Sequence, residues 1–286
     1  MEPRDILTRP APPPDLVLRY GPDRDHVADL RLPAVPETSQ TAAPLVVFLH
    51  GGFWRAAYDR AHTGPLGAAL AADGFAVCAP EYRRVGQPGG GWPGTFDDVA
   101  AAIDVLPGVA AQATEGRVDP GRLLLAGHSA GGHLALWAAS RHRLPAGAPW
   151  AAPACSSPSL YLGVVALAAV SDLISCHRQG LGNGAVALLL GGGPDTQSGR
   201  YALTNPVGLL PTGTPVRLAH GRADEIVPCD MSLDYAARAQ AAGDDAACAA
   251  LPGAGHFALI DPLSTAWPEV AAAFRALDSP AGPAAI

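Results

Sequence analysis

The sequence predicts an α/β fold, built on a mostly parallel, doubly wound sheet of about eight strands. Two segments near the start of the chain alternate apolar and polar residues, as half-exposed antiparallel strands do. Six later segments are short and wholly apolar, which is typical of strands buried on both faces. Helix-like segments separate most of these six, and this repeated β–α alternation indicates a parallel sheet covered by helices.

The two alternating segments, residues 16–19 and 27–32, should open the sheet as an antiparallel hairpin. The six apolar segments give the buried strands that we expect at residues 45–49, 75–79, 123–126, 164–169, 216–219 and 246–251. The helix-like segments give the helices that we expect at residues 62–72, 96–105, 130–140, 231–242 and 262–277.

The chain of 286 residues is expected to form one domain over residues 1–279. The stretch 171–214 breaks the alternation, because it is rich in glycine and polar residues and holds one short apolar segment, residues 185–190. We interpret this stretch as a small lid insertion. The proline-rich residues 1–13 and the proline- and alanine-rich residues 280–286 are expected to be flexible tails.

Composition narrows the class of partner. The chain is 49% hydrophobic and 16% charged, which fits the core of a compact enzyme. Its net charge of −7 comes without the basic stripe that a phosphate backbone needs, so we expect no nucleic-acid partner and favour a small uncharged or cationic ligand. No apolar run approaches the roughly 18 residues that span a bilayer, so we expect no membrane partner. The oligomeric state is left open, with a homodimer as one option.

The spacing of the cysteines bears on metal binding, and the first residues of the chain bear on its location in the cell. The five cysteines are scattered, and none has a metal-site spacing, so we expect no metal and no cofactor. The first residues mix charges with prolines and lack the apolar core of a signal peptide, so we expect a cytoplasmic location.

The segment GHSAG, residues 127–131, marks Ser129 as the candidate nucleophile. It follows the apolar run LLLA directly and opens a helix-like stretch, which is the strand–turn–helix context of a nucleophile elbow. A serine on so sharp a turn needs small residues two positions away on each side, and Gly127 and Gly131 supply them. The pentapeptide alone is weak evidence in a chain with 33 glycines, so its position carries the prediction.

A second glycine-rich segment, HGGFW at residues 50–54, follows the buried strand expected at residues 45–49. Backbone N–H groups of such a loop can approach and stabilise the oxyanion that forms during acyl hydrolysis. We expect Gly52 or Phe53 to donate from this loop. Ala130, directly after the candidate nucleophile, should supply another N–H group.

Several aromatic side chains lie near these motifs. His50 is expected to organise its loop through hydrogen bonds to the backbone. Trp54 is either a wall of the substrate pocket or ordinary packing. His128 and Phe257 are further candidates for the substrate pocket, because they flank the candidate nucleophile and base. His62 lies in a helix-like segment, where we expect a surface or core residue.

The candidate acid and base follow the later strands. Asp224 comes just after the strand expected at residues 216–219, at the carboxyl end where ligands gather in open α/β sheets. Glu225 and Asp172 are the competing carboxylates. His256, in the glycine-containing segment LPGAGHF, is the candidate general base. The order serine, aspartate, histidine is that of α/β-hydrolases and differs from the orders in other serine hydrolases.

Together these motifs resemble the α/β-hydrolase superfamily, in particular the kynurenine formamidase (arylformamidase) group and the hormone-sensitive-lipase-like esterases. HGGFW and GHSAGGHLA carry the resemblance, which covers about residues 45–277. His50, Gly51, Gly52 and Trp54 match the HGGxW loop of the formamidase group. The lipase-like esterases usually have a third glycine where this chain has Phe53. That difference favours the formamidase side.

The resemblance extends to the acid and base loops, HGRADEIVP and GHF, and to Glu81-Tyr82-Arg83, which looks like the Asp-Tyr-Arg of these families. It implies the α/β-hydrolase fold and a catalytic triad of Ser129, Asp224 and His256. It does not fix the substrate, because related sequences hydrolyse formamides, several kinds of ester and peptides.

The leading functional hypothesis is hydrolysis of a small acyl ester or amide through an acyl-enzyme, with N-formylkynurenine as one candidate amide. A thioesterase or cyclising acyltransferase of a biosynthetic pathway would use the same triad. The expected lid, however, has only Arg178 and Arg200 with which to dock a carrier. A hydrolase-fold protein that binds a small molecule without catalysis is a third option, and its expected signature is a damaged triad.

Overall fold

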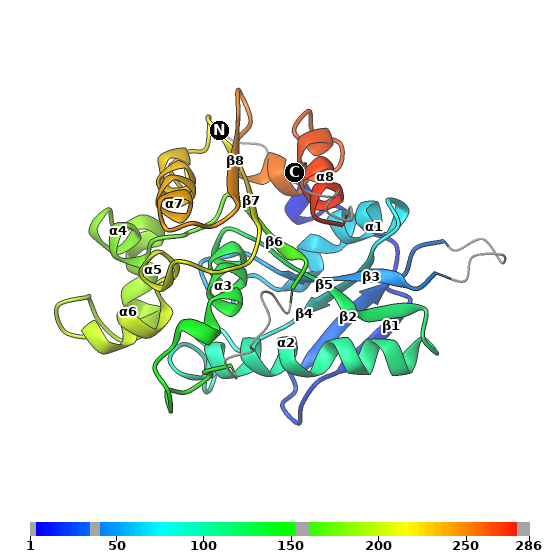
Figure 1. Ribbon diagram of the computed structural model, residues 1–286, viewed down its shortest axis with the longest axis horizontal. Helices are drawn as coiled ribbons and strands as arrows, with labels where there is room; N and C mark the ends of the chain where they lie inside the picture. Colours follow the sequence, from blue (N-terminus) through cyan, green and yellow to red (C-terminus); the bar gives the residue numbers. More distant parts are fainter. Residues whose placement is uncertain (1–3, 35–40, 153–160, 279–286) are drawn as a thin grey trace, which may run out of the picture.

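A computed structural model describes residues 4–34, 41–152 and 161–278. Eight strands form one sheet (Figure 1). They are β1 (Leu16–Arg19), β2 (Val27–Arg31), β3 (Ala43–Leu49), β4 (Ala76–Pro80), β5 (Val118–His128), β6 (Gly163–Leu167), β7 (Val216–Gly221) and β8 (Ala246–Leu251).

The order of the strands confirms the predicted architecture. Across the sheet it is β1-β2-β4-β3-β5-β6-β7-β8. β2 pairs antiparallel with both β1 and β4, and all other neighbouring strands are parallel. The strands differ from expectation mainly in length. β5 starts at Val118, five residues before the apolar run, because its polar beginning still pairs with the start of β3 before a register shift.

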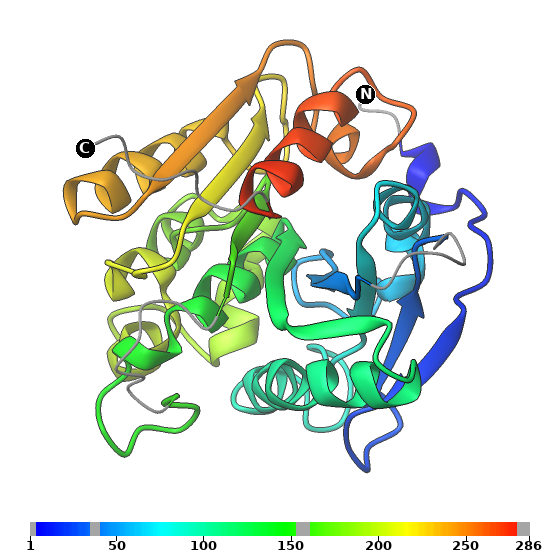
Figure 2. The ribbon, with the colours of Figure 1, turned by 45° about the vertical axis from the view of Figure 1, so that its right-hand side comes forward.

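Helices cover both faces of the sheet (Figures 1 and 2). Side chains of β3 alternate between the two layers, because successive residues of a strand point to opposite faces. The larger helices are α1 (Gly64–Ala72), α2 (Gly94–Ala113), α3 (Ala130–Ala139), α7 (Cys229–Ala241) and α8 (Trp267–Asp278). Leu45, Val47 and Leu49 pack in the core cluster that contains α2, α3 and α7, whereas Val46 and Phe48 pack in the one that contains α1 and α8.

The expected lid stretch, residues 171–214, is mainly helical. It contains α4 (Leu173–Arg178), α5 (Leu181–Leu190) and α6 (Ser198–Thr204), which lie together at one end of the molecule (Figure 1). Each of these helices contributes buried side chains to the same core cluster as α3. In this conformation the stretch is therefore part of the packed body of the domain.

The start of the chain differs from the expected flexible tail over the residues that the structure describes. The short 3-10 helix η1 (Asp5–Leu7) lies beside α1 (Figure 2), and Ile6, only 2% exposed, packs in the core cluster of α1 and α8. Arg9 forms an ion pair with Asp261. The expected tail at residues 280–286 lies outside the described residues.

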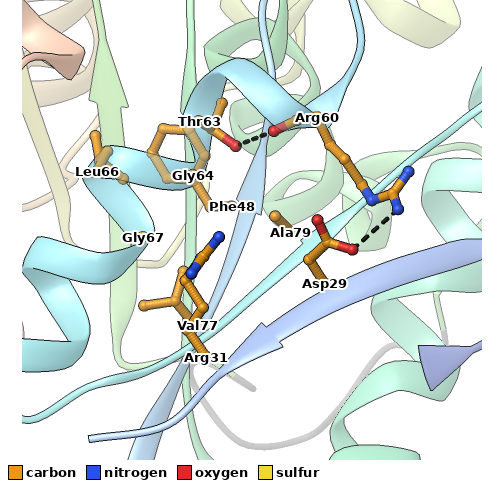
Figure 3. A pocket seen from close by; sticks show the side chains of 10 residues that line it. All are labelled: Asp29, Arg31, Phe48, Arg60, Thr63, Gly64, Leu66, Gly67, Val77 and Ala79. Carbon is orange, nitrogen blue, oxygen red and sulfur yellow. Dashed lines mark hydrogen bonds and ion pairs between the residues drawn. The ribbon is translucent and has the colours of Figure 1, made fainter. Parts of the chain in front are cut away.

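Several polar side chains, among them Asp29, Arg31 and Arg60, line a small cavity between α1 and β2 (Figure 3). One of them, Arg31, also holds residues 12 and 13. Arg31 donates to the carbonyl oxygens of Pro12 and Pro13 at 2.6 and 3.2 Å. Arg60 donates to Asp29 at 2.9 Å. Residues 12 and 13 are thus attached to β2 through Arg31 before the chain enters β1. Within the described residues, the structure contains no helix with the length and apolar character required to cross a bilayer.

Candidate active site

Ser129 lies on a sharp turn between β5 and α3. Its backbone angles, φ 56° and ψ −117°, are strained for a residue with a side chain. The two neighbouring glycines are required, since a Cβ at Gly127 would lie 2.2 Å from the carbonyl oxygen of Gly131, and one at Gly131 would lie 1.9 Å from that of Leu49. The turn therefore has the strained geometry that the GHSAG segment predicts.

Ser129 and His256 line the same cavity, which has a volume of about 130 Å³. His128 and Phe257, two of the three expected pocket residues, line it as well. The rest of its wall comes from the N-terminal segment, the HGGFW loop and the loops beside it, namely Arg4, Leu7, Gly52, Phe53, Tyr58, His62 and Ile226.

Asp224 and His256 meet at the carboxyl ends of β7 and β8, which are neighbours in the sheet. Nδ1 of His256 lies 2.6 Å from Oδ2 of Asp224, whose side chain is fully buried. The other oxygen of Asp224 accepts hydrogen bonds from the N–H groups of Ile226 and Val227 at 2.8 Å each. Burial alone would raise the pKa of Asp224, but hydrogen bonds from His220, His256 and the backbone outweigh it and hold that pKa well below its usual value.

His220 is a residue of this site that the sequence analysis did not single out. Its Nε2 lies 3.1 Å from Oδ2 of Asp224 and 2.9 Å from the carbonyl oxygen of Val227. Because a carbonyl oxygen can only accept, Nε2 carries the hydrogen. Nδ1, 2.7 Å from Oγ of Ser232, then accepts a hydrogen bond from the serine hydroxyl. The available signal in the sequence was a histidine four residues before the candidate acid.

The two competing carboxylates lie elsewhere. Asp172 caps α4, where its Oδ1 accepts from the N–H groups of Ile174 and Ser175 at 2.9 and 3.1 Å. Glu225 is exposed. Of the three carboxylates considered, Asp224 is the one that contacts His256.

The HGGFW loop lies directly against Ser129. A Cβ at Gly51 would fall 3.2 Å from Cβ of Ser129. Gly52, Phe53 and Trp54 all have positive φ, of 112°, 50° and 56°, so the backbone turns left-handed three times in succession.

The N–H groups of Gly52, Phe53 and Ala130 make no hydrogen bond within the described part of the chain. A backbone N–H beside a cavity and without a partner is available to a ligand. The structure thus brings all three expected oxyanion donors to the region of Ser129.

Trp54 does not line the cavity, so of the two alternatives for this residue the structure favours ordinary packing over a pocket wall. It is fully buried, and its ring packs edge-on against His133, with ring centres 5.2 Å apart. The left-handed turn of the loop directs this large side chain into the core. His62, expected on the surface or in the core, lines the cavity instead. Burial lowers the pKa of His62 to about 4.

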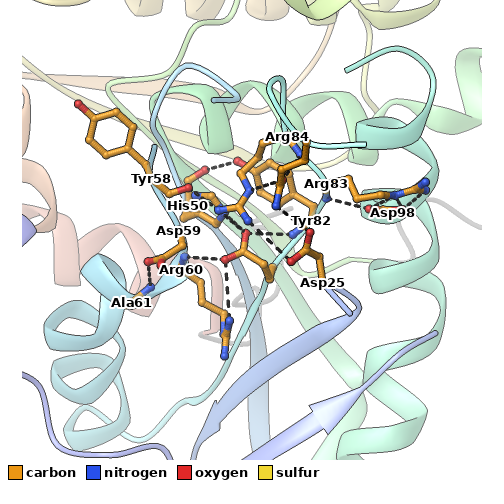
Figure 4. Close-up of polar contacts among 12 residues, drawn as sticks. Asp25, His50, Tyr58, Asp59, Arg60, Ala61, Tyr82, Arg83, Arg84 and Asp98 are labelled. Atoms are coloured by element: carbon orange, nitrogen blue, oxygen red, sulfur yellow. Dashed lines mark hydrogen bonds and ion pairs between the residues drawn. The ribbon is translucent and has the colours of Figure 1, made fainter. Parts of the chain in front are cut away.

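His50 anchors the HGGFW loop through a buried polar network, part of which is labelled in Figure 4. Its Nδ1 is 2.8 Å from the carbonyl oxygen of Gly51, and its Nε2 is 2.8 Å from Glu81. Tyr82 donates to the carbonyl oxygen of His50 at 2.8 Å, and Arg84 lies 3.1 Å from Glu81. Burial would raise the pKa of Glu81, but its cationic and hydrogen-bonding neighbours outweigh burial and lower it.

In the segments that the structure describes, no three His, Cys, Asp or Glu side chains are grouped so that they could hold a metal ion. The arrangement that the structure does assemble is a strained serine, a histidine paired with a buried carboxylate, and the HGGFW loop at one cavity, with the N–H group of Ala130 directly after the serine.

The chain is similar in sequence to a family of known proteins and to individual esterases. The model of the BD-FAE family matches residues 29–238, well over half of the chain. The chain is similar to the isoprenylcysteine alpha-carbonyl methylesterase ICME of Arabidopsis thaliana, with 29% identity over 259 residues, covering 85% of this chain and 57% of that protein. It is also similar to an acetyl-hydrolase of Streptomyces hygroscopicus, with 36% identity over 123 residues, which are 40% of this chain and 38% of that one.

The fold is likewise found in solved esterases. A truncated carbohydrate esterase from gut microbiota superposes with a TM-score of 0.72 at 24% identity, over 92% of this chain and 95% of that one. The doubly wound sheet is therefore that of the α/β-hydrolase fold. The curated relatives are longer proteins, of which this chain spans between about two fifths and three fifths. By the match over residues 29–238, the chain belongs to the BD-FAE family.

Proposed function

We propose that the protein is a serine hydrolase that cleaves a small carboxylic ester through an acyl-enzyme on Ser129. The observation that carries the proposal is that Ser129 and His256 line one cavity while Asp224 holds Nδ1 of His256. With Nδ1 donating to the carboxylate, Nε2 of His256 is the nitrogen that remains to accept a proton.

In this mechanism His256 removes the hydroxyl proton of Ser129 as the oxygen attacks the acyl carbon. The tetrahedral intermediate collapses when His256 returns the proton to the leaving alcohol. Water, activated by the same imidazole, then attacks the acyl carbon and releases the acid and Ser129. Asp224 fixes the tautomer of His256 and stabilises its cationic form, for which the depressed pKa of the carboxyl keeps a negative charge available.

The negative charge that develops on the acyl oxygen needs converging donors. Ala130 supplies one N–H group from the N-terminus of α3, and Gly52 and Phe53 supply the others from the HGGFW loop. Since these groups make no hydrogen bond to the described residues, they need not break one when the oxyanion forms.

The size of the cavity favours a small substrate group. Its volume of about 130 Å³ is close to the ~150 Å³ that admits a benzene molecule in an engineered protein cavity. Phe53, Tyr58 and Phe257 give it an aromatic wall. The names of the related proteins, a methylesterase and an acetyl-hydrolase, favour an ester with a small group on one side. Formamide cleavage, with N-formylkynurenine as the aromatic amide, is the finer alternative that the aromatic wall favours.

The test compares Ser129→Ala with wild type in hydrolysis of p-nitrophenyl acetate and in labelling by a fluorophosphonate probe. Ser140→Ala is the matched control, because Ser140 lies at the end of α3 and its hydroxyl bonds the carbonyl oxygen of Leu136 instead of facing the cavity. We expect Ser129→Ala to lose both turnover and labelling and Ser140→Ala to keep them. Turnover retained by Ser129→Ala, or absence of labelling in wild type, would refute the proposal.

A second assay separates ester from amide specialisation. Wild-type protein is compared on N-formylkynurenine and on p-nitrophenyl acetate by kcat/KM. The proposal predicts the larger value for the ester. A larger value for the formamide would assign the site to amide hydrolysis, with the same roles for Ser129 and His256.

A further inference from the structure

The N-terminal segment provides one wall of the cavity that contains Ser129. Arg4, which precedes η1, and Leu7, which ends it, line the cavity from the opposite end of the chain from His256. Ile6 is buried in the core, and Arg9 pairs with Asp261 in the loop that follows η5 (Phe257–Ile260). The wall is therefore fixed to the body of the domain on both sides of Leu7.

Arg4 is the one residue with a permanent charge among the described residues that line this cavity. Its guanidinium lies over the ring of Phe257, 5.7 Å from the ring centre, next to His256 in the chain. No described carboxylate lies within ion-pair distance of it. By contrast Arg9, at the neighbouring cleft, is already neutralised by Asp261.

The other basic groups of the cavity do not compete with Arg4 as anion partners. Burial lowers the pKa of His62 to about 4 and holds the pKa of His128 well below its usual value, so both rings are neutral near pH 7. His128 also donates Nε2–H to the carbonyl oxygen of His256, at 3.0 Å. His256 itself is held by Asp224.

We infer that the substrate carries a carboxylate, which Arg4 binds while Ser129 attacks the ester carbonyl of the same molecule. A guanidinium presents paired donors that match a carboxylate, and beside apolar walls such a contact is stronger than in water. The remaining wall is aromatic and aliphatic, so it suits the uncharged body of the substrate. The inference rests on the proposed function and specifies the substrate class of that site.

The net charge of the chain, −7, points the other way, toward an uncharged or cationic ligand. Over distances beyond about 8 Å, physiological salt screens most of that field. The side chain of Arg4 is exposed on the wall of the cavity, close to any substrate bound there, so its attraction for that substrate is screened less than that of distant charges. The local charge of Arg4 therefore decides the preference.

The experiment uses two pairs of esters that differ in one negative charge. The first pair is mono-4-nitrophenyl succinate and its methyl ester, which place the charge on the acyl side. The second is 4-acetoxybenzoate and its methyl ester, which place it on the leaving side. For each pair, the ratio of kcat/KM for the charged ester to that for the capped ester is measured in wild type, Arg4→Gln, Arg4→Lys and the control Arg24→Gln.

Arg24→Gln loses the same charge at a side chain that is 76% exposed and outside the cavity. We expect Arg4→Gln to lower the ratio at least about fivefold for one of the two pairs, the size of a partly exposed arginine–carboxylate contact. Arg4→Lys should recover part of that loss, and Arg24→Gln should leave the ratio at its wild-type value. In wild type, 0.5 M NaCl should reduce the ratio.

A ratio that Arg4→Gln leaves unchanged for both pairs would overturn the inference, as would an equal fall in Arg24→Gln. If wild type hydrolyses none of the four esters, the inference is decided by calorimetric titration with benzoate and benzamide. Failure on p-nitrophenyl acetate as well would refute the proposed function. Benzoate binding that is lost in Arg4→Gln then supports an anion site at Arg4. Equal binding of benzoate by both proteins refutes it.

Discussion

His220 and His256 contact the same oxygen, Oδ2 of Asp224, at 3.1 and 2.6 Å. The carboxylate is therefore held from two sides. The carbonyl oxygen of Val227 fixes the tautomer of His220, and the hydroxyl of Ser232 donates to its Nδ1. This arrangement makes His220 a positioning residue for the proposed base, because it acts through Asp224 without lining the cavity.

Replacement of His220 should affect both rate and pH dependence. His220→Leu removes one donor from Asp224, so the carboxylate is held less firmly against His256, which lowers the rate. The carboxylate also keeps more negative charge, which raises the pH at which His256 loses its proton. We expect kcat for p-nitrophenyl acetate to fall about tenfold or more, as for the loss of a hydrogen bond to a charged group. The acid limb of the kcat/KM profile should move to higher pH, and His220→Gln should restore part of the rate. A lower rate with an unmoved limb would show that His220 is only structural.

The two aspartates considered as the acid should respond differently to removal of their charge. Asp224→Asn should lower kcat by about 10³ to 10⁴, because the amide no longer selects the tautomer of His256. Asp172→Asn should instead weaken the cap of α4 and cost about 1 kcal/mol of unfolding free energy or less, with little change in kcat. Steady-state kinetics and urea unfolding of both variants test this. A large loss of kcat in Asp172→Asn would reverse the assignment.

Gly52 and Gly74 form a matched pair for testing the loop beside Ser129. Both have positive φ, of 112° and 100°, so alanine strains the backbone at each position. A Cβ at Gly52 would also collide with Tyr58 at 2.5 Å, whereas a Cβ at Gly74 would meet nothing within 4 Å. We expect Gly52→Ala to lower kcat at least about tenfold, because the loop must move away from the oxyanion.

The control, Gly74→Ala, should lose about 1 kcal/mol of unfolding free energy and keep wild-type kcat. Equal kcat values in the two alanine variants would count against a role for the HGGFW loop in the reaction. Urea unfolding measured on both proteins separates the backbone strain, which they share, from the displacement of the loop.

We predict that protonation of the buried His133 lowers the free energy of unfolding in acid. Burial lowers its pKa to about 4 from 6.5, and its Nδ1 has no partner among the described residues. Since the unfolded chain takes up this proton below pH 6.5 and the folded chain only near pH 4, its contribution is complete above pH 6.5 and is lost as the pH falls toward 4. At pH 5 this loss is about 2 kcal/mol.

The test is urea unfolding at pH 7 and pH 5 for wild type, His133→Gln and the control His142→Gln. His133→Gln removes the buried titrating group, so the fall in unfolding free energy between the two pH values should shrink by about 2 kcal/mol. His142 is exposed, and its replacement should leave the fall at its wild-type size. An undiminished fall in His133→Gln would contradict the prediction.

The sequence predicted the sheet well, because each strand buried on both faces is a continuous apolar run that periodicity detects. Limits of elements were harder to predict. α2 continues through Pro107 to Ala113, although proline normally ends a helix, and β5 begins in the polar segment before its apolar run. In both cases tertiary pairing or packing outweighs the local preference.

At the site, the residues within glycine-rich motifs could be predicted, since those motifs carry their own geometry. Trp54 could not be placed, because its direction depends on two left-handed residues in succession after Gly52. The positions of Arg4 and His220 relative to the site depend on the tertiary structure alone. Arg4 reaches the cavity from a segment whose composition predicts flexibility, and no pattern in the sequence predicts that Arg4 lines the cavity.

The wide separation of the site residues along the chain has a consequence for protein synthesis. Ser129 leaves the ribosome well before His256, and β7 and β8 must both join the sheet before the acid and the base can meet. A nascent chain therefore contains Ser129 before the acid and the base that would activate it are in place. Under the proposed mechanism, esterase activity in a translation mixture would appear only after His256 has been synthesised and β8 has joined the edge of the sheet.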